Sequence, residues 1–249
     1  MKYGLCHLGV VPIRKENNHR SELTSQLLYG DLFKIIDQRK DWYKIRTAWD
    51  DYEGWVLQQQ CFLINKEQFV GLKELPSVCN TQLFDLILQP NGENFPIPLG
   101  SDLRALSLLN QTLDQIPQPL EKSKAEIVKT AYQYLNAPYL WGGKTPLGID
   151  CSGLTQIVYK IHGIPIKRDA YLQAEQGTTL SFIEESEPGD LAFFDNEEGN
   201  IIHVGILLKN HYILHAHGKV RIDRIDQTGI FNSEKNTHSH KLRLIKSIL

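Results

Sequence analysis

One cysteine, Cys151, stands where a loop is expected to pass into a helix. The residues before it, 138–150, are rich in Gly and Pro, which interrupt regular structure. Apolar residues then recur at helical spacing from Leu154 until Gly163. Asp150 is a favoured N-cap type. Although a free cysteine is commonly a small buried apolar residue, the helix N-terminus favours the thiolate, so we predict a nucleophilic Cys151 with a lowered pKa.

A nucleophilic cysteine needs a base, and a third group commonly orients that base. His203 and His215 lie on consecutive strand-like segments, 202–207 and 211–217. A three-residue loop at 208–210 would pair position 203 with 215 and place both rings on one face; an even-length loop would separate them. We therefore predict that Cys151 is the nucleophile, His203 the base and later the acid, and His215 the residue that orients His203, with space beside the rings at Gly205.

No metal and no cofactor are expected. Zinc would use a second thiolate or an acidic ligand beside the histidines, and the pattern places neither there. The four cysteines show no C-x-x-C spacing, which favours free thiols over a zinc site or a disulfide scaffold. The remaining seven histidines are predicted to be non-catalytic.

The composition of the 249 residues excludes several classes of partner. A formal net charge of −2 provides no basic surface, so nucleic acid and anionic membranes are not expected as partners. No apolar run approaches the roughly 20 residues of a membrane span. The N-terminus is not typical of a signal peptide. If Met1 is the native start, we expect a cytoplasmic protein, and otherwise one of the periplasm or cell envelope.

The elements that must position these residues divide the chain into three parts. Residues 1–65 read as short strands separated by polar turns, which favours a small all-β barrel. The segments 11–14, 26–30, 41–45 and 51–56, in that order, resemble a bacterial SH3 domain. Residues 66–120 are either a linker or a reduced second SH3-like unit, with a possible strand at 83–88 and prolines in 95–101 that exclude a central strand.

The third part, residues 121–249, begins with helices and continues with strands. A helix is predicted over 122–135 and another after Cys151, and antiparallel strands follow residue 188. Helices first and strands afterwards indicate an α+β domain in which helices pack on an antiparallel sheet.

The same part of the chain resembles the NlpC/p60 family of papain-like bacterial cell-wall peptidases. The resemblance spans roughly residues 122–249 and depends on several short motifs in combination. These are residues 138–143, 150–154, 168–173, 188–194, 203–206 and 215–216. The resemblance implies a papain-like fold, and with the SH3-like front it implies the subgroup that cleaves γ-D-glutamyl–diamino acid bonds in murein peptides.

The resemblance also implies which residues contact substrate. Tyr139 matches the position whose hydroxyl helps bind the oxyanion, and Trp141 lines the cleft, although a core aromatic is the alternative for Trp141. Asp150 and Ser152 would hold the amino end and the γ-D-Glu carboxylate of the substrate.

Further substrate contacts are implied outside the loop before the nucleophile. Asp169 and Ala170 occupy a substrate-binding motif in which the family often carries Ser near position 170, and alanine removes that hydroxyl. In the subgroup the SH3-like domain packs over the cleft and requires a free N-terminal L-Ala. Glu22 or Tyr52 would read the ammonium group of that residue.

The expected function is that of a cysteine peptidase that releases L-Ala-γ-D-Glu from free murein peptides in cell-wall recycling. The expected partner is the murein peptide, and we expect a monomer. A papain-like amidase or acyltransferase would use the same thiol, and a murein-binding module would use the SH3-like surface without catalysis. The sequence does not distinguish diaminopimelate from lysine in the substrate.

Overall fold

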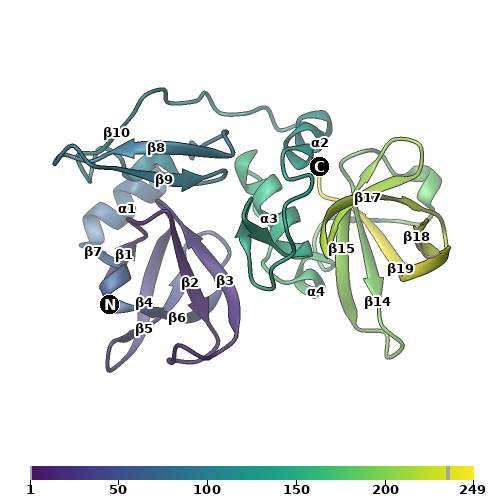
Figure 1. The fold of residues 1–249 in the computed structure, drawn as a ribbon, viewed down its shortest axis with the longest axis horizontal. Coiled ribbons are helices and arrows are strands. Elements are labelled where there is room, and N and C mark those ends of the chain that lie inside the picture. Colours follow the sequence, from purple (N-terminus) through teal and green to yellow (C-terminus); the bar gives the residue numbers. More distant parts are fainter. Residues whose placement is uncertain (1, 234–235) are drawn as a thin grey trace. The chain divides into compact units, whose positions relative to one another are not determined.

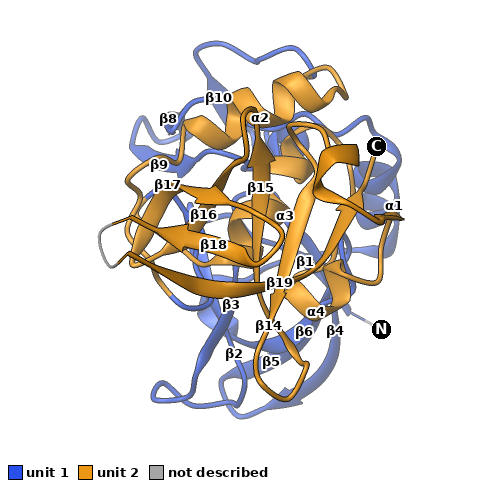
Figure 2. Ribbon diagram, turned by 90° about the vertical axis from the view of Figure 1, so that its right-hand side faces the viewer, with its two compact units in different colours: residues 1–119, 141–146 blue, residues 120–140, 147–249 orange. Residues whose placement is uncertain are grey.

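The computed structural model describes residues 2–233 and 236–249 (Figure 1). The chain forms two compact units, coloured separately in Figure 2. Unit 1 comprises Met1–Pro119 and Trp141–Pro146, and unit 2 comprises Leu120–Leu140 and Leu147–Leu249. In the described parts of the chain, every helix is too short or too polar to cross a membrane.

The first part of unit 1 is a sheet of short antiparallel strands in the order β3-β2-β6-β5-β4-β1-β7. Its strands are β1 (Lys2–Leu5), β2 (Val10–Arg14), β3 (Leu23–Leu28), β4 (Leu32–Arg39), β5 (Trp42–Thr47), β6 (Glu53–Leu57) and β7 (Phe62–Ile64). Alternate side chains such as Phe33, Ile45 and Val56 are buried in one core. The strands predicted in the first 65 residues are therefore confirmed, and burial alternates along part of the sheet, as in β2, in the way expected of a half-buried strand.

The remainder of unit 1 adds a helix and a small sheet. Its elements are η1 (Gln58–Gln60), α1 (Lys66–Glu74), β8 (Phe84–Leu88), β9 (Asn94–Pro98), η2 (Leu103–Ala105) and β10 (Thr112–Leu113). The predicted strand at 83–88 is β8, and the proline-bearing β9 is an edge strand of the order β10-β8-β9, as proline requires. Helix α1 was not expected from the sequence; it begins with a capping box between Asn65 and Gln68.

Helices of unit 2 lie on the outer side of its sheet. They are α2 (Lys124–Tyr132), α3 (Cys151–Ile161) and α4 (Ala170–Gln173), with the short turn η3 (Ile183–Glu185). All three α-helices contact β15. Every residue of α3 is buried, and the helix stops before Gly163, which takes a φ of +68° that favours glycine.

The strands of unit 2 form a sheet that closes on itself, because β19 pairs with both β14 and β18. The strands of this sheet are β13 (Thr178–Leu180), β14 (Leu191–Asp195), β15 (Ile201–Leu208), β16 (Tyr212–His217), β17 (Lys219–Ile225), β18 (Gly229–Asn232) and β19 (Thr237–Ser247). The short strands β11 (Lys144–Thr145), in unit 1, and β12 (Gly148–Ile149), in unit 2, are not part of it. Inward side chains from β14 to β19, including Phe194, Leu207 and Ile213, form the core of the closed sheet. The helices therefore cover its outer face, where Val204 and Ile206 are fully buried.

Candidate active site

Cys151 is the first residue of α3, as the sequence predicts. Asp150 is the N-cap, and its Oδ1 accepts a hydrogen bond of 2.7 Å from the backbone N–H of Gly153. The Cys151 side chain is buried, and its sulfur accepts backbone hydrogen bonds from Ser152 and from Val204 on β15. The thiol therefore lies against the strand that carries His203.

His203 and His215 meet on one face of the β15–β16 hairpin. Nε2 of His203 is 2.8 Å from Nδ1 of His215, and both rings are buried. The predicted pairing of 203 with 215 is wrong by two residues, because Gly205 is the partner of His215 and the loop spans 209–211. A shift of two preserves the face of each side chain, so the rings still meet as diagonal neighbours.

Gly205 provides the space that the histidine pair needs. A Cβ atom at this position would lie 2.7 Å from Ile213 Cδ1 and 2.9 Å from His215 Cβ. A side chain at this position would overlap Ile213 and His215, so the prediction that Gly205 leaves space beside the rings is confirmed.

A carboxylate, which the sequence analysis did not expect here, continues the row of histidines. Nε2 of His215 is 2.9 Å from Oδ2 of Asp223 on β17. Arg221 binds the same carboxylate, with Nη2 donating to Oδ1 at 2.9 Å and Nε lying 2.7 Å from Oδ2. The available signal was alternation along β17, since residues 221 and 223 pair with 215 and 213 and share their face.

Two further histidines border the pair, although both were predicted to be non-catalytic. The His240 ring stacks on the His203 ring with 4.2 Å between centroids, and the exposed His217 lies edge-on to His240 at 5.0 Å. Among the described residues, no group of three or more His, Cys, Asp and Glu side chains is arranged to hold a metal ion.

Burial determines the charge states of the nucleophile and the base. It raises the pKa of Cys151 to about 12, assisted by Asp150, although two backbone N–H groups and Arg168 act in the opposite direction. Burial and the neighbouring His215, His240 and His217 hold the pKa of His203 well below its ordinary 6.5. The predicted lowering of the thiol pKa is therefore wrong for this enclosed site, because burial outweighs the helix N-terminus.

The lowered pKa of His203 predicts the pH at which activity is lost on the acid side of the pH profile. A general base acts in its unprotonated form, so lowering its pKa moves its protonation to lower pH. We expect kcat/KM of the free enzyme to keep its neutral value well below pH 6.5, as measured from initial rates across the acid range. An acid limb at or above pH 6.5 would contradict the neutral, buried His203.

Asp150 and Ser152, predicted to bind substrate, are joined to a buried arginine. Arg168 is 2% exposed, and its Nη1 and Nη2 donate to Asp150 Oδ1 at 3.0 Å and Oδ2 at 2.6 Å. Nη1 also donates to Ser152 Oγ at 2.9 Å. From the sequence, Arg168 was expected only as part of the motif at residues 168–173. The structure makes it the group that fixes both residues flanking Cys151.

The other predicted site residues of unit 2 lie at two places. Tyr139 precedes the nucleophile; burial, followed by the charges of Cys151 and Asp150, raises its pKa to about 12. Its hydroxyl is therefore a neutral hydrogen-bond donor near Cys151. Asp169 is the N-cap of α4, and Ala170 is its buried first residue.

The predicted residues of unit 1 lie on separate elements. Trp141 is 58% exposed, and its Nε1 donates to Glu22 Oε1 at 2.8 Å. Glu22 also pairs with Lys15 at 3.4 Å. Tyr52 is partly buried against the core of the first sheet. The structure therefore joins Trp141 to Glu22, a pairing that was not predicted from the sequence.

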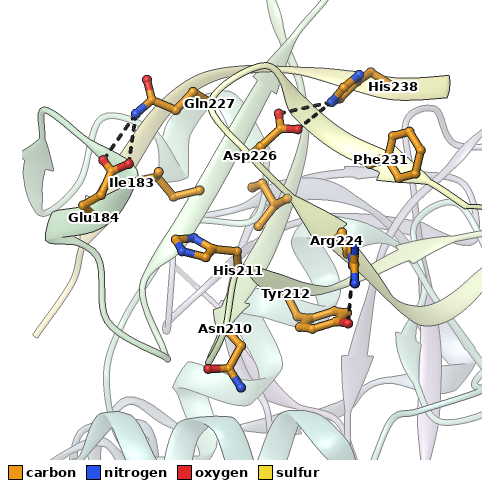
Figure 3. A pocket seen from close by; sticks show the side chains of 11 residues that line it. Ile183, Glu184, Asn210, His211, Tyr212, Arg224, Asp226, Gln227, Phe231 and His238 are labelled. Carbon is orange, nitrogen blue, oxygen red and sulfur yellow. Dashed lines mark hydrogen bonds and ion pairs between the residues drawn. The ribbon is translucent and has the colours of Figure 1, made fainter.

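A separate pocket of unit 2 has a volume of about 860 Å³ and contains none of the predicted catalytic residues. Figure 3 shows its charged walls, where Asp226 contacts His238 and Arg224 contacts Tyr212. Arg224 and Asp223 are neighbours on β17, so their side chains leave opposite faces of the strand. This pocket is thus distinct from the row that ends at Asp223.

The comparisons with known proteins agree with the fold. Residues 136–238 match the NlpC/P60 family, and residues 13–60 match the bacterial dipeptidyl-peptidase SH3 domain. A crystal structure of an NlpC/P60 family protein from Bacillus cereus superposes with a TM-score of 0.79 and 17% identity, covering 99% of each chain. The chain is therefore similar to the NlpC/P60 family over residues 136–238 and to the bacterial dipeptidyl-peptidase SH3 domain over residues 13–60, in the order that the resemblance implied.

Two curated relatives extend over most of the chain. The gamma-D-glutamyl-L-lysine dipeptidyl-peptidase of Bacillus cereus is 25% identical over 231 residues, which cover 79% of this chain and 68% of the relative. Dipeptidyl-peptidase 6 of Lysinibacillus sphaericus is 28% identical over 244 residues, which cover 85% and 88%. This chain is thus similar to dipeptidyl-peptidases in both of its domains.

Proposed function

We propose that this protein is a cysteine peptidase that hydrolyses peptides of peptidoglycan. The observation that carries the proposal is the buried row of His203, His215 and Asp223, which starts on β15, the strand whose backbone at Val204 contacts the Cys151 thiol. A nucleophile, a base and an orienting group are the parts that acyl transfer through a thiol requires. The names of the relatives, dipeptidyl-peptidases, support the same class of reaction.

The residues divide the reaction into two steps. Cys151 Sγ attacks the carbonyl carbon of the scissile amide while its proton passes to His203, which then protonates the departing amine. The resulting thioester is hydrolysed by water, which gives a proton to His203; that proton returns to Sγ as the acid product leaves. The N-terminus of α3 and the Tyr139 hydroxyl would stabilise the oxyanion of both tetrahedral intermediates.

The finer proposal concerns the substrate. We propose cleavage of the γ-D-glutamyl–diamino acid bond in murein peptides that have a free N-terminal L-Ala, with release of L-Ala-γ-D-Glu in cell-wall recycling. The relative named for gamma-D-glutamyl-L-lysine supports this bond type. It makes L-lysine the first diamino acid to test, with diaminopimelate beside it.

A peptide assay tests this proposal. L-Ala-γ-D-Glu-L-Lys, its diaminopimelate counterpart and the N-acetylated form of each would be compared by release of the dipeptide. We expect cleavage only of the free-amine peptides. Equal cleavage of the acetylated forms would favour a general amidase, and an absence of cleavage with all four would contradict the peptidase.

Glu22 and Tyr52 are proposed to bind the N-terminal ammonium group of the substrate. Glu22 offers a carboxylate that is 41% exposed, and a charge-assisted hydrogen bond contributes about 1.5–3 kcal/mol. We expect Glu22→Gln and Tyr52→Ala each to raise KM for free-amine peptides about tenfold with little change in kcat, as measured by steady-state kinetics.

Glu53→Gln is the matched control in the same domain. Glu53 pairs with Arg46 and Lys44 on the strand surface and is not assigned to substrate. Its KM should stay at the wild-type value. If either the Glu22 or the Tyr52 variant also keeps the wild-type KM, that residue does not bind the ammonium group.

A further inference from the structure

We propose that Asp223 is a positioning residue that sets the tautomers of His215 and His203. This proposal extends the peptidase assignment, since it concerns the proton acceptor for Cys151. The carboxylate of Asp223 is buried on β17 at the end of the row of ring nitrogens. It does not touch the thiol, so it would act only through the two histidines.

The tautomers of His215 and His203 follow from which ring nitrogen must donate each hydrogen bond and which must accept it. An ionised carboxylate only accepts, so the 2.9 Å contact with Asp223 requires a proton on His215 Nε2. Burial lowers the pKa of His215, and the neutral ring has a bare Nδ1. That nitrogen accepts the 2.8 Å hydrogen bond, so His203 must carry its proton on Nε2. His203 Nδ1 is then the bare nitrogen, free to take the thiol proton.

Arg221 keeps this arrangement intact. Burial acts to raise the pKa of Asp223, but the hydrogen bonds from His215 and Arg221 outweigh it and the net pKa is lowered. Among the described residues, His217 on β16 and His240 on β19 are the further histidines beside the row. Because Arg221 keeps Asp223 an acceptor, each ring N–H of the row donates toward the carboxylate. The bare nitrogen at the other end of the row is then Nδ1 of His203.

Asp223→Asn is the variant that tests this donor–acceptor order of the hydrogen bonds. An amide has the shape of the carboxylate, but it is able to donate to His215 Nε2 and so permits the opposite tautomers. We expect kcat to fall about 100-fold or more with KM nearly unchanged, as for the loss of an orienting carboxylate. Nitrogen-15 NMR of histidine-labelled protein should show wild-type His203 protonated at Nε2, and a mixed or inverted pattern in the variant.

Asp226→Asn is the matched control. Asp226 also pairs with a histidine, His238, at 2.9 Å, but this pair lies in the other pocket. The control should leave kcat and the His203 tautomer at their wild-type values. If wild-type His203 is protonated at Nδ1, or if Asp223→Asn leaves both the tautomer and kcat unchanged, the proposal is overturned.

Arg221→Gln provides a second variant should Asp223→Asn fail to fold. Without the guanidinium, Asp223 protonates at higher pH and ceases to be an acceptor-only group. The acid limb of kcat should therefore move to higher pH, and an unmoved limb would count against the proposal. The NMR measurement needs no substrate, so it decides the tautomer even if the proposed murein peptides are not cleaved.

Discussion

Replacing Cys151 with alanine is expected to lower kcat by about 10⁴-fold or more, because the variant has no atom able to form the thioester. Each tenfold loss corresponds to about 1.4 kcal/mol of transition-state stabilisation. The fold should survive, since the change removes one sulfur atom from a buried position, a loss of about 1 kcal/mol. Dipeptide release measures the first effect, and circular dichroism with thermal unfolding measures the second.

Cys61→Ala is the control for a general effect of thiol loss. Cys61 is partly buried in unit 1, where its sulfur contacts the Leu57 carbonyl oxygen, and it is not assigned to the reaction. Its kcat should equal the wild-type value. Substantial activity in Cys151→Ala would refute the nucleophile, and loss of activity in both variants would indicate damage unrelated to the site.

Replacing Arg168 with methionine is expected to destabilise the protein by about 3–5 kcal/mol. The change leaves the Asp150 carboxylate buried without its charge partner, and an unpaired buried charge has a cost of this size. For a protein of this length each kcal/mol moves Tm by about 2–4 °C, so we expect a fall of about 10 °C in a thermal scan. The N-cap of α3 would also loosen, so activity should fall with stability.

Lys129→Met is the matched control, because its ion pair with Glu126 lies on the surface of α2, where the Lys129 side chain is 74% exposed. Surface pairs contribute about 0–1 kcal/mol, so this variant should unfold near the wild-type temperature. Adding Asp150→Asn to Arg168→Met removes the stranded charge and should restore part of the lost stability. Equal Tm values for Arg168→Met and Lys129→Met would show that the buried pair contributes little.

Local sequence patterns were sufficient for the elements around the nucleophile. The N-cap Asp150, the helix that starts at Cys151 and its end near Gly163 all depend on neighbouring residues, and all were predicted correctly. The strands of the SH3-like front follow from alternation in the same way. Helix α1 was missed because its apolar positions are few, although the capping box at Asn65 marked its start.

Pairing across strands was predicted less well, for a physical reason. Alternation fixes which face a side chain takes, so His203 and His215 were correctly placed together. Alternation does not fix the loop, and the register was wrong by two residues. The contribution of Asp223 was missed because it depends on how a third strand, β17, pairs with β16.

The sequence by itself determined the chemical types of the site: a thiol at a helix N-terminus and two histidines on one face of a hairpin. Only the tertiary structure decided their electrostatics, because burial raises the pKa of Cys151 and lowers that of His203. The same is true of Arg168 and Asp223, which support the site from other elements. Burial and charge pairing sum over atoms distant in the chain, so no local pattern encodes them.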